Sequence, residues 1–189
     1  MSREKLISLE AVNPETATGR AKELFDEAKS TVGFVPNMYA NMANNTALLD
    51  TYFHGYGKFR EGSGLSSQEQ EVIFLAISST NNCEYCMGAH SMIADKMSGV
   101  PADVLQAIRA GKEIPDAKLA ALDAFTRVMV TSKGNPDKEA IAAFHAAGYE
   151  DKDMLAIVLA ISVKVISNYS NHLFASQLDD AFSAYSWPE

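Results

Sequence analysis

The residues best suited to chemistry lie in one short stretch, NNCEYCMGAH, at positions 81–90. It contains Cys83 and Cys86, the two cysteines of the chain, followed by His90. Spacings of three and four residues place these side chains on one face of a helix, where they can touch. Two such thiols can form and break a disulfide, and a neighbouring imidazole can take a thiol proton. The stretch therefore predicts a thiol redox pair with a histidine base.

Other interpretations of the cysteine pair need features that the sequence supplies poorly. A structural disulfide closing so short a loop contributes only about 2 kcal/mol and is kept reduced in a cytoplasm. A c-type haem site needs histidine directly after the second cysteine, where Met87 stands. Zinc could use Cys83, Cys86 and His90, but a closed structural site needs a fourth ligand. A thioredoxin-like motif follows a strand, and no strand pattern precedes Cys83.

The position of each thiol in its helix affects its ionisation. Asn81 and Asn82 interrupt an apolar run, and asparagine is a favoured N-cap, so a helix is predicted to begin near Cys83. A helix N-terminus favours a thiolate and can lower a free cysteine pKa of about 8.5 by one or more units. From the residues alone Cys83 is the expected nucleophile, while Cys86 lies one turn further in, beside His90.

Glu71 is a further candidate, twelve residues before Cys83 and on the helix that the two asparagines separate from the cysteine helix. An antiparallel pairing of these two helices would bring Glu71 to the thiols. The alternative is an ordinary solvated glutamate in the first turn that helps to cap its helix, in which case Glu69 would be equivalent.

Helical signals dominate the chain, and no stretch shows sustained alternation with a period of two, so we predict an all-α fold. Ser66 or Ser67 caps one helix, where Glu69 and Gln70 fall at capping-box spacing before the apolar run VIFLAI. The stretch GFVPNMY, at 33–39, is interpreted as a turn. The predicted helices span about 16–31, 46–56, 66–80, 83–98, 101–110, 116–132, 137–146 and 151–182, the last with a bend near 167–170.

Composition and charge limit the classes of function. The 189 residues are 47% hydrophobic and 21% charged, which is typical of a folded domain. A net charge of −8 without a run of Lys or Arg argues against nucleic-acid partners. The N-terminus lacks the apolar region of a secretion signal, and the longest apolar stretch, Met154–Ile166, is too short for a membrane span and contains Lys164. A cytoplasmic location without membrane partners is therefore expected.

An internal comparison indicates that the helical scaffold occurs twice. Shifting the chain by 84 residues aligns LAISSTNNCEYCMGAH, 75–90, with LAISVKVISNYSNHLF, 159–174; chance similarity between helices rich in alanine and leucine is the alternative. We predict one all-helical domain over 1–189, with a motif-bearing repeat at about 64–97 and a degenerate, thiol-free repeat at about 148–181. The fold then does not need the thiols, which favours a chemical role for them. The polar groups are replaced together: Ser167 for Cys83, Ser170 for Cys86, Phe174 for His90 and Leu155 for Glu71.

Glu71, followed twelve positions later by the start of CEYCMGAH, resembles the motif of the alkylhydroperoxidase D-like, or carboxymuconolactone decarboxylase, superfamily in its peroxidase-related branch. GFVPNMYANMANNTALLDTY before the motif and ISNYSNHL after it resemble the same branch, so the likeness covers most of the chain. The resemblance implies an all-helical fold with internal duplication, commonly assembled into homo-oligomers such as trimers or hexamers. It also implies a peroxidase that needs neither haem nor metal, so no cofactor is expected.

Carried over to this chain, the resemblance gives each motif residue a role. Glu71 and His90 form a proton relay that deprotonates Cys86, whose thiolate attacks the O–O bond of an organic hydroperoxide and becomes a sulfenic acid. Cys83 resolves it to a disulfide, and an external dithiol reduces the pair; in the best-known member this is a lipoyl group on a partner protein. The resemblance thus makes Cys86 the nucleophile, whereas the helix-terminus argument favours Cys83. Cys86 is preferred because His90 can accept its proton directly.

The chain departs from the founding member of the family at Tyr85, since there a histidine lies between the cysteines. Tyr85 could donate a hydrogen bond to a peroxide oxygen, but an ordinary tyrosine pKa of about 10 makes it a poor base. Tyr169 repeats it in the second copy, so packing is the favoured role. Lactone decarboxylation is not expected, because the branch that performs it generally lacks the cysteine pair.

The remaining histidines are expected to lie outside the chemistry. His54 and His145 are interpreted as surface or helix-packing residues, and His172 as structural or pocket-lining. Two alternative functions stay open. One is a thiol-disulfide oxidoreductase or redox sensor without peroxide specificity, and the other is a non-catalytic oligomeric binding protein whose cysteine pair is vestigial.

Overall fold

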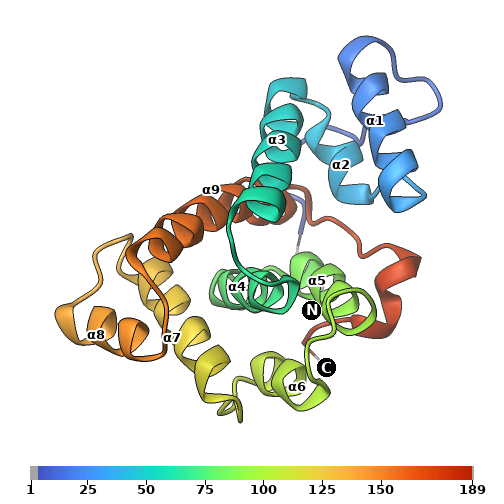
Figure 1. Ribbon diagram of the computed structural model, residues 1–189. Helices are drawn as coiled ribbons and strands as arrows, with labels where there is room; N and C mark the ends of the chain where they lie inside the picture. The colour runs from blue at the N-terminus through green and yellow to red at the C-terminus, as the bar shows by residue number, and fades with distance from the viewer. Residues whose placement is uncertain (1–3, 189) are drawn as a thin grey trace.

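The computed structural model describes residues 4–188, and within them the chain forms nine α-helices, one 3-10 helix and no strand. The predicted all-α fold is confirmed. In chain order (Figure 1) the elements are α1 (Gly19–Val32), α2 (Asn37–Met42), α3 (Thr46–Gly62), α4 (Ser67–Thr80), α5 (Glu84–Lys96), α6 (Ala102–Ala110), α7 (Ala117–Thr131), α8 (Lys138–Ala146), α9 (Asp151–Phe174) and the 3-10 helix η1 (Asp180–Tyr185).

Helix α4 forms the centre of the fold. Every residue from Gln70 to Ser78 is buried, and a helix that is apolar on nearly all sides is stable only in such an interior position. Helices α5, α6, α7 and α9 pack against it, as Figure 1 shows in a view nearly along the α4 axis. The central position of α4 carries Glu71 into the interior together with the apolar residues around it.

Side-chain caps define the starts of several helices. The Ser66 hydroxyl accepts a hydrogen bond from the Glu69 N–H, and the Glu69 carboxylate accepts one from the Ser66 N–H, so the predicted capping box is formed. Asp116 and Asp137 cap α7 and α8 with their side chains. Helices α6, α7 and α8 match the predicted spans to within one residue at each end.

Several predicted elements differ from the structure, among them the helix predicted over 46–56, which continues to Gly62. The segment 33–39 is not a simple turn, because α2 begins at Asn37, directly after Pro36, whose ring fixes a φ suited to a helix entrance. The last helix ends at Phe174 rather than near 182, since Ala175 takes a left-handed conformation (φ 48°) and its N–H bonds back to the Asn171 carbonyl. Helix α9 runs without interruption through the predicted bend at 167–170.

Replacing Ser66 with alanine is expected to lower the free energy of unfolding by about 1 kcal/mol, because α4 loses its side-chain cap. Urea unfolding followed by circular dichroism measures the change. Ser67→Ala is the matched control: the Ser67 hydroxyl is exposed and lies 3.5 Å from the Ser98 carbonyl oxygen, so its loss should cost less than about 0.5 kcal/mol. Equal losses in the two variants would contradict the capping role.

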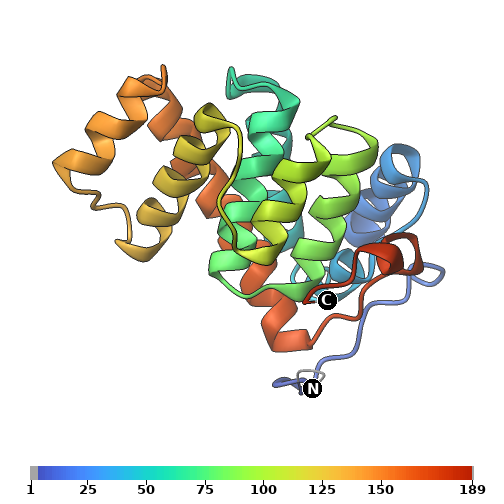
Figure 2. The same ribbon diagram turned by 90° about the horizontal axis from the view of Figure 1, so that it is seen from below.

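Helix α9 and the chain that follows it complete the frame around the cysteines. Helix α9 contacts α2, α3, α4, α5 and α7. By length and composition alone it could cross a membrane, and half of its most apolar window is buried inside the protein. Residues 175–188, here called the C-terminal segment, then return along α5, on the side of α1 and α2 (Figure 2). Trp187 Nε1 anchors this segment by donating to the Arg109 carbonyl at 2.8 Å.

Candidate redox site

The break between α4 and α5 positions Cys83. Asn82 takes a left-handed conformation (φ 54°), and the Cys83 N–H donates to the Ser78 carbonyl at 2.9 Å, which turns the chain back at the end of α4. Cys83 is itself the N-cap of α5, with extended backbone angles (φ −92°, ψ 94°), so the first helical residue is Glu84. The predicted start of this helix is therefore correct to within one residue.

The structure brings the two sulfurs to one amide group. Asn171 Nδ2 lies 3.3 Å from Cys86 Sγ and 3.8 Å from Cys83 Sγ. Both thiols are free, and the two residues are only 1% and 2% exposed, for Cys83 and Cys86 respectively. Because a single N–H group contacts both sulfurs, they are close neighbours, as their spacing in the sequence predicts.

Helix α9 supplies the polar groups beside Cys86. Ser167 Oγ lies 3.8 Å from Cys86 Sγ, and Asn171 follows one turn later on the same helix. Lys164, one turn before Ser167, is fully buried. In the repeat comparison this region is a thiol-free copy of the scaffold, so the sequence does not predict that any of the three residues lies at the thiols. The available signal was Lys164, a charge inside the otherwise apolar run 154–166.

Glu71 and His90 form the second part of the site. Glu71 Oε2 lies 2.8 Å from His90 Nδ1, and Arg60 forms an ion pair with the other carboxylate oxygen. Burial raises the pKa of Glu71, but His90 and Arg60 outweigh burial and hold it below its ordinary value. The ionised carboxylate accepts a hydrogen bond from the Nδ1–H group, which leaves His90 Nε2 as the basic nitrogen. Sequence reasoning missed Arg60, since no spacing rule links it to the motif.

The two glutamates of α4 have different environments. Glu71 has no solvent exposure. Glu69 belongs to the capping box and contacts Lys118 Nζ at 2.9 Å and the Tyr149 hydroxyl at 3.0 Å. Glu71 is thus not a solvated capping residue, and Glu69 is not its equivalent.

The two thiols differ in pKa. Burial, followed by the hydrogen bond with Cys86, raises the pKa of Cys83 well above its ordinary value. Burial also opposes ionisation of Cys86, but the hydrogen bond from Cys83 and the positive charge of Lys164 outweigh it and place the pKa of Cys86 well below its ordinary value. Of the two thiols, Cys86 is therefore the one that ionises more readily. The helix terminus does not ionise Cys83, because burial dominates there.

His90 does not contact the thiolate directly. Burial and the charge of Lys164 lower the pKa of His90, so its imidazole is neutral at neutral pH. Its ring centroid lies 4.8 Å from that of Phe74. Within residues 4–188 the hydrogen-bond partners of Cys86 Sγ are Cys83, Ser167 and Asn171, so the direct bond expected between Cys86 and His90 is not formed. A proton that moves between them needs a bridging group.

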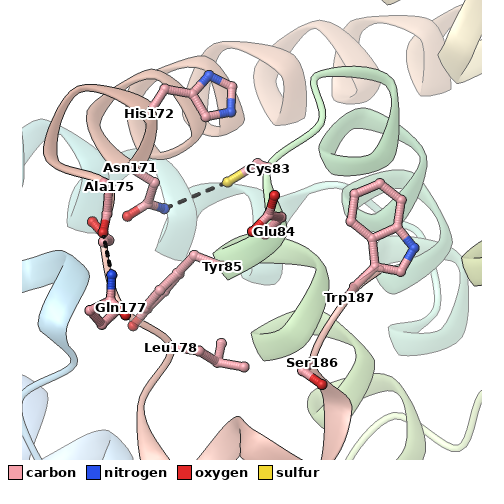
Figure 3. A pocket seen from close by; sticks show the side chains of 11 residues that line it. Cys83, Glu84, Tyr85, Asn171, His172, Ala175, Gln177, Leu178, Ser186 and Trp187 are labelled. Carbon is pink, nitrogen blue, oxygen red and sulfur yellow. Dashed lines mark hydrogen bonds between the residues drawn. The ribbon is translucent and has the colours of Figure 1, made fainter. Parts of the chain in front are cut away.

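A pocket of about 190 Å³ lies beside Cys83. Figure 3 shows Asn171 and His172 of α9 on one side of it and Trp187 of the C-terminal segment on the other. Cys83 is part of its lining, whereas Cys86 is not. An external molecule in the pocket therefore meets the Cys83 sulfur first. The remaining lining residues are Glu84, Tyr85, Ala175, Ser176, Gln177, Leu178 and Ser186.

Tyr85 lines this pocket, but its hydroxyl is already engaged. It donates to the carboxylate of Asp179, which also accepts the Asn37 N–H at 3.0 Å. Burial and the neighbouring Asp179 raise the pKa of Tyr85, so the hydroxyl stays protonated. Tyr169 is 55% exposed, so the two tyrosines do not share the packing role inferred from the repeat. Tyr85 instead links α5 to the C-terminal segment.

The other histidines lie largely where the sequence placed them. His54 and His145 are exposed, and His145 Nε2 lies 2.9 Å from an Asp151 oxygen. His172 lines the pocket near Cys83, in agreement with the pocket-lining interpretation. In the described part of the chain, no group of three His, Cys, Asp or Glu side chains is arranged to hold a metal ion.

The fold and the site define an all-helical protein with a buried thiol pair next to a Glu–His–Arg network. Residues 47–128 match the model of the carboxymuconolactone decarboxylase family. This segment runs from α3 into α7 and contains Glu71, both cysteines and His90. This match lies on the motif-bearing segment and confirms the superfamily resemblance.

Solved structures share the fold over nearly the whole chain. A peroxidase-related protein from Ralstonia eutropha JMP134, described as an alkylhydroperoxidase AhpD core, has a TM-score of 0.81 at 20% identity and is covered over 95% of each chain. A peroxidase-related protein from Silicibacter sp. TM1040 has a TM-score of 0.79 at 20% identity over 96% of each chain. A cysteine-to-alanine variant of the debrominase Bmp8 with 2,3,4-tribromopyrrole has a TM-score of 0.77 at 19% identity, over 96% of this chain and 97% of that one. No curated protein matches the chain. At such identities the likeness establishes the fold.

Proposed function

We propose that the protein is a thiol-dependent peroxidase, which reduces organic hydroperoxides through a disulfide cycle of Cys83 and Cys86. One observation carries the proposal: Asn171 contacts both sulfurs, and of the two only Cys86 has a lowered pKa. A thiolate next to a protonated thiol is the arrangement that a stepwise oxidation to a disulfide requires. The family of the motif segment and the peroxidase-related structural neighbours support this general class.

In the first step the Cys86 thiolate attacks the terminal oxygen of the peroxide. The S–O bond forms, the O–O bond breaks, and the departing alkoxide takes up a proton to become an alcohol. Sulfur loses two electrons and becomes a sulfenic acid, while the peroxide gains them. Glu71 holds the Nδ1–H of His90, so Nε2 is the nitrogen that can exchange a proton with the reacting groups.

In the second step Cys83 attacks the sulfenic acid, the S–S bond forms, and water leaves. An external dithiol then reduces the disulfide, and we propose a lipoyl group on a partner protein for this role. The dithiol meets Cys83 first, because Cys83 lines the pocket. Cys86 then departs as a thiolate, and a thiol of low pKa is the faster leaving group in thiol-disulfide exchange. Cys83 is thus the cysteine that the dithiol attacks, and Cys86 is the cysteine that leaves as a thiolate.

Mass spectrometry of the full-length protein tests the proposal. Cumene hydroperoxide added to the reduced protein is expected to remove two hydrogens per chain, with the bridge mapped between Cys83 and Cys86, and dihydrolipoamide is expected to restore them. Steady turnover of the peroxide with dihydrolipoamide should follow. Reduction of insulin disulfides without peroxide turnover would instead support the general oxidoreductase, and an unchanged mass would support the binding protein.

Reductive debromination is a second candidate. Tyr85, Leu178 and Trp187 give the pocket of about 190 Å³ an apolar lining, which suits a small halogenated ring, and one structural neighbour is a debrominase. In such a reaction a carbon–bromine bond becomes carbon–hydrogen, bromide leaves, and the two thiols supply the electrons and become a disulfide. Release of bromide from 2,3,4-tribromopyrrole by the reduced protein, in the absence of peroxide turnover, would favour this function.

A further inference from the structure

Lys164 is a buried cation that the thiol motif does not account for. Its side chain has no exposure, and within residues 4–188 its Nζ makes no hydrogen bond. The Nζ lies 5.4 Å from the centroid of the Phe74 ring, which is a weak contact for an ammonium removed from water. A buried charge is tolerated when an opposite charge compensates it. The question is which anion fills that role.

The buried carboxylate of the site is already paired. Glu71 accepts from His90 Nδ1 at 2.8 Å and forms an ion pair with Arg60. Arg60 is held in turn by the Tyr56 hydroxyl at 2.7 Å and by Gln70 Oε1 at 3.1 Å. These contacts use both carboxylate oxygens, so Glu71 does not serve as the main counter-ion of Lys164.

The other buried titratable groups that interact with Cys86 are neutral at neutral pH. Tyr39 of α2, Tyr52 of α3 and Tyr85 of α5 interact electrostatically with Cys86. Burial raises the pKa of each tyrosine, so the three hydroxyls stay protonated. Cys83 is protonated and His90 is neutral, since burial raises the pKa of the first and lowers that of the second. Cys86 is therefore the anion left for Lys164. The helix that carries Lys164 also carries Ser167, whose Oγ is 3.8 Å from Cys86 Sγ.

We infer that Lys164 is the counter-ion of the Cys86 thiolate, so that α9 provides the charge that activates the nucleophile of α5. Lys164 is then a positioning residue, which acts through Cys86. Its effect on turnover rests on the proposed peroxidase function, but the ion pair itself does not. When peroxide oxidises Cys86, the anion is lost and Lys164 is left unpaired, so thiolate formation upon reduction restores the buried pair.

The ultraviolet absorbance of the thiolate, recorded against pH on the reduced full-length protein, tests the ion pair without any substrate. In Lys164→Met the inflection of Cys86 is expected to move upward by roughly one to three pH units, the usual effect of one close opposite charge. Lys58→Met, the same change at an exposed position of α3, should leave the inflection in place. An unchanged inflection in a folded Lys164→Met protein would overturn the inference, even if peroxide turnover is intact.

A second pair of variants decides the question if Lys164→Met does not fold. Cys86→Asp places a fixed carboxylate near Lys164, and Cys86→Ser places a neutral group there. With Lys164 as the partner, Cys86→Asp should melt at the same temperature as Cys86→Ser or higher at neutral pH. A clearly lower melting temperature for Cys86→Asp would mean that no cation compensates a charge at this position, and would overturn the inference. A protein that shows the ion pair but no peroxide turnover would refute only the proposed function.

Discussion

Replacing Cys86 with serine is expected to reduce hydroperoxide consumption by at least ~10³-fold, a loss of the size seen when an activated nucleophile is removed. A serine hydroxyl is not ionised at neutral pH and has no sulfur to oxidise, so no first step takes place. The buried environment that lowers the pKa of the thiol gives no comparable help to a hydroxyl. The measurement is kcat/KM for cumene hydroperoxide, with dihydrolipoamide as the reductant.

Cys83→Ser is the control for this variant, because it removes the other sulfur by the same change. It is expected to react once, forming a sulfenic acid on Cys86 that dimedone traps, and then to stop because no partner thiol resolves it. The two variants thus fail at different steps. If Cys86→Ser still formed a trapped sulfenic acid and Cys83→Ser did not, the roles of the two cysteines would be reversed.

Removal of the buried carboxylate is expected to produce the largest loss of stability in the site. In Glu71→Ala, both Arg60 and His90 lose their shared partner, and breaking a buried ion pair from one side typically costs 3–5 kcal/mol. The Arg60 side chain keeps 21% exposure, so we expect about 3 kcal/mol, the low end of that range. Urea unfolding at neutral pH measures the loss, and Glu61→Ala, at an exposed position of α3, should cost less than about 0.5 kcal/mol.

The same pair of proteins gives a test by pH. The folded pKa of Glu71 lies below its ordinary value of 4.5, so the unfolded chain binds the proton more readily than the folded one. The stabilising contribution is complete above pH 4.5 and is lost as the pH falls through the folded pKa. The stability gap between the natural protein and Glu71→Ala should therefore narrow below pH 4.5. A gap independent of pH would show that packing, and not charge, underlies the effect.

Local rules predicted the parts of the site that lie close together in the sequence. The capping box at Ser66 fixed the start of α4, and the asparagine break fixed the start of α5 to within one residue. Those two boundaries bring Glu71 to His90 across an antiparallel helix pair. Spacing alone identified the cysteines and the histidine as neighbours on one helix.

The rest of the site depends on contacts between distant segments, which spacing cannot encode. Ser167 and Asn171 reach the sulfurs from more than 80 residues away. The repeat comparison describes their region only by the cysteines and the histidine that it lacks. The repeat itself stays a prediction. The acidity of the thiols was also inaccessible, because the helix-terminus argument for Cys83 omits the cost of burial. The family resemblance pointed to Cys86 where residue-level reasoning did not.

The C-terminal segment forms one wall of the pocket beside Cys83. Leu178, Ser186 and Trp187 line the cavity, while the groups that set the acidity of Cys86 lie on α5 and α9. In the proposed peroxidase, one wall of the substrate pocket therefore comes from a stretch of the polypeptide other than the helices that carry Cys86 and Lys164. Exchanging these wall residues offers a route to new substrates that leaves the electron-transfer pair intact.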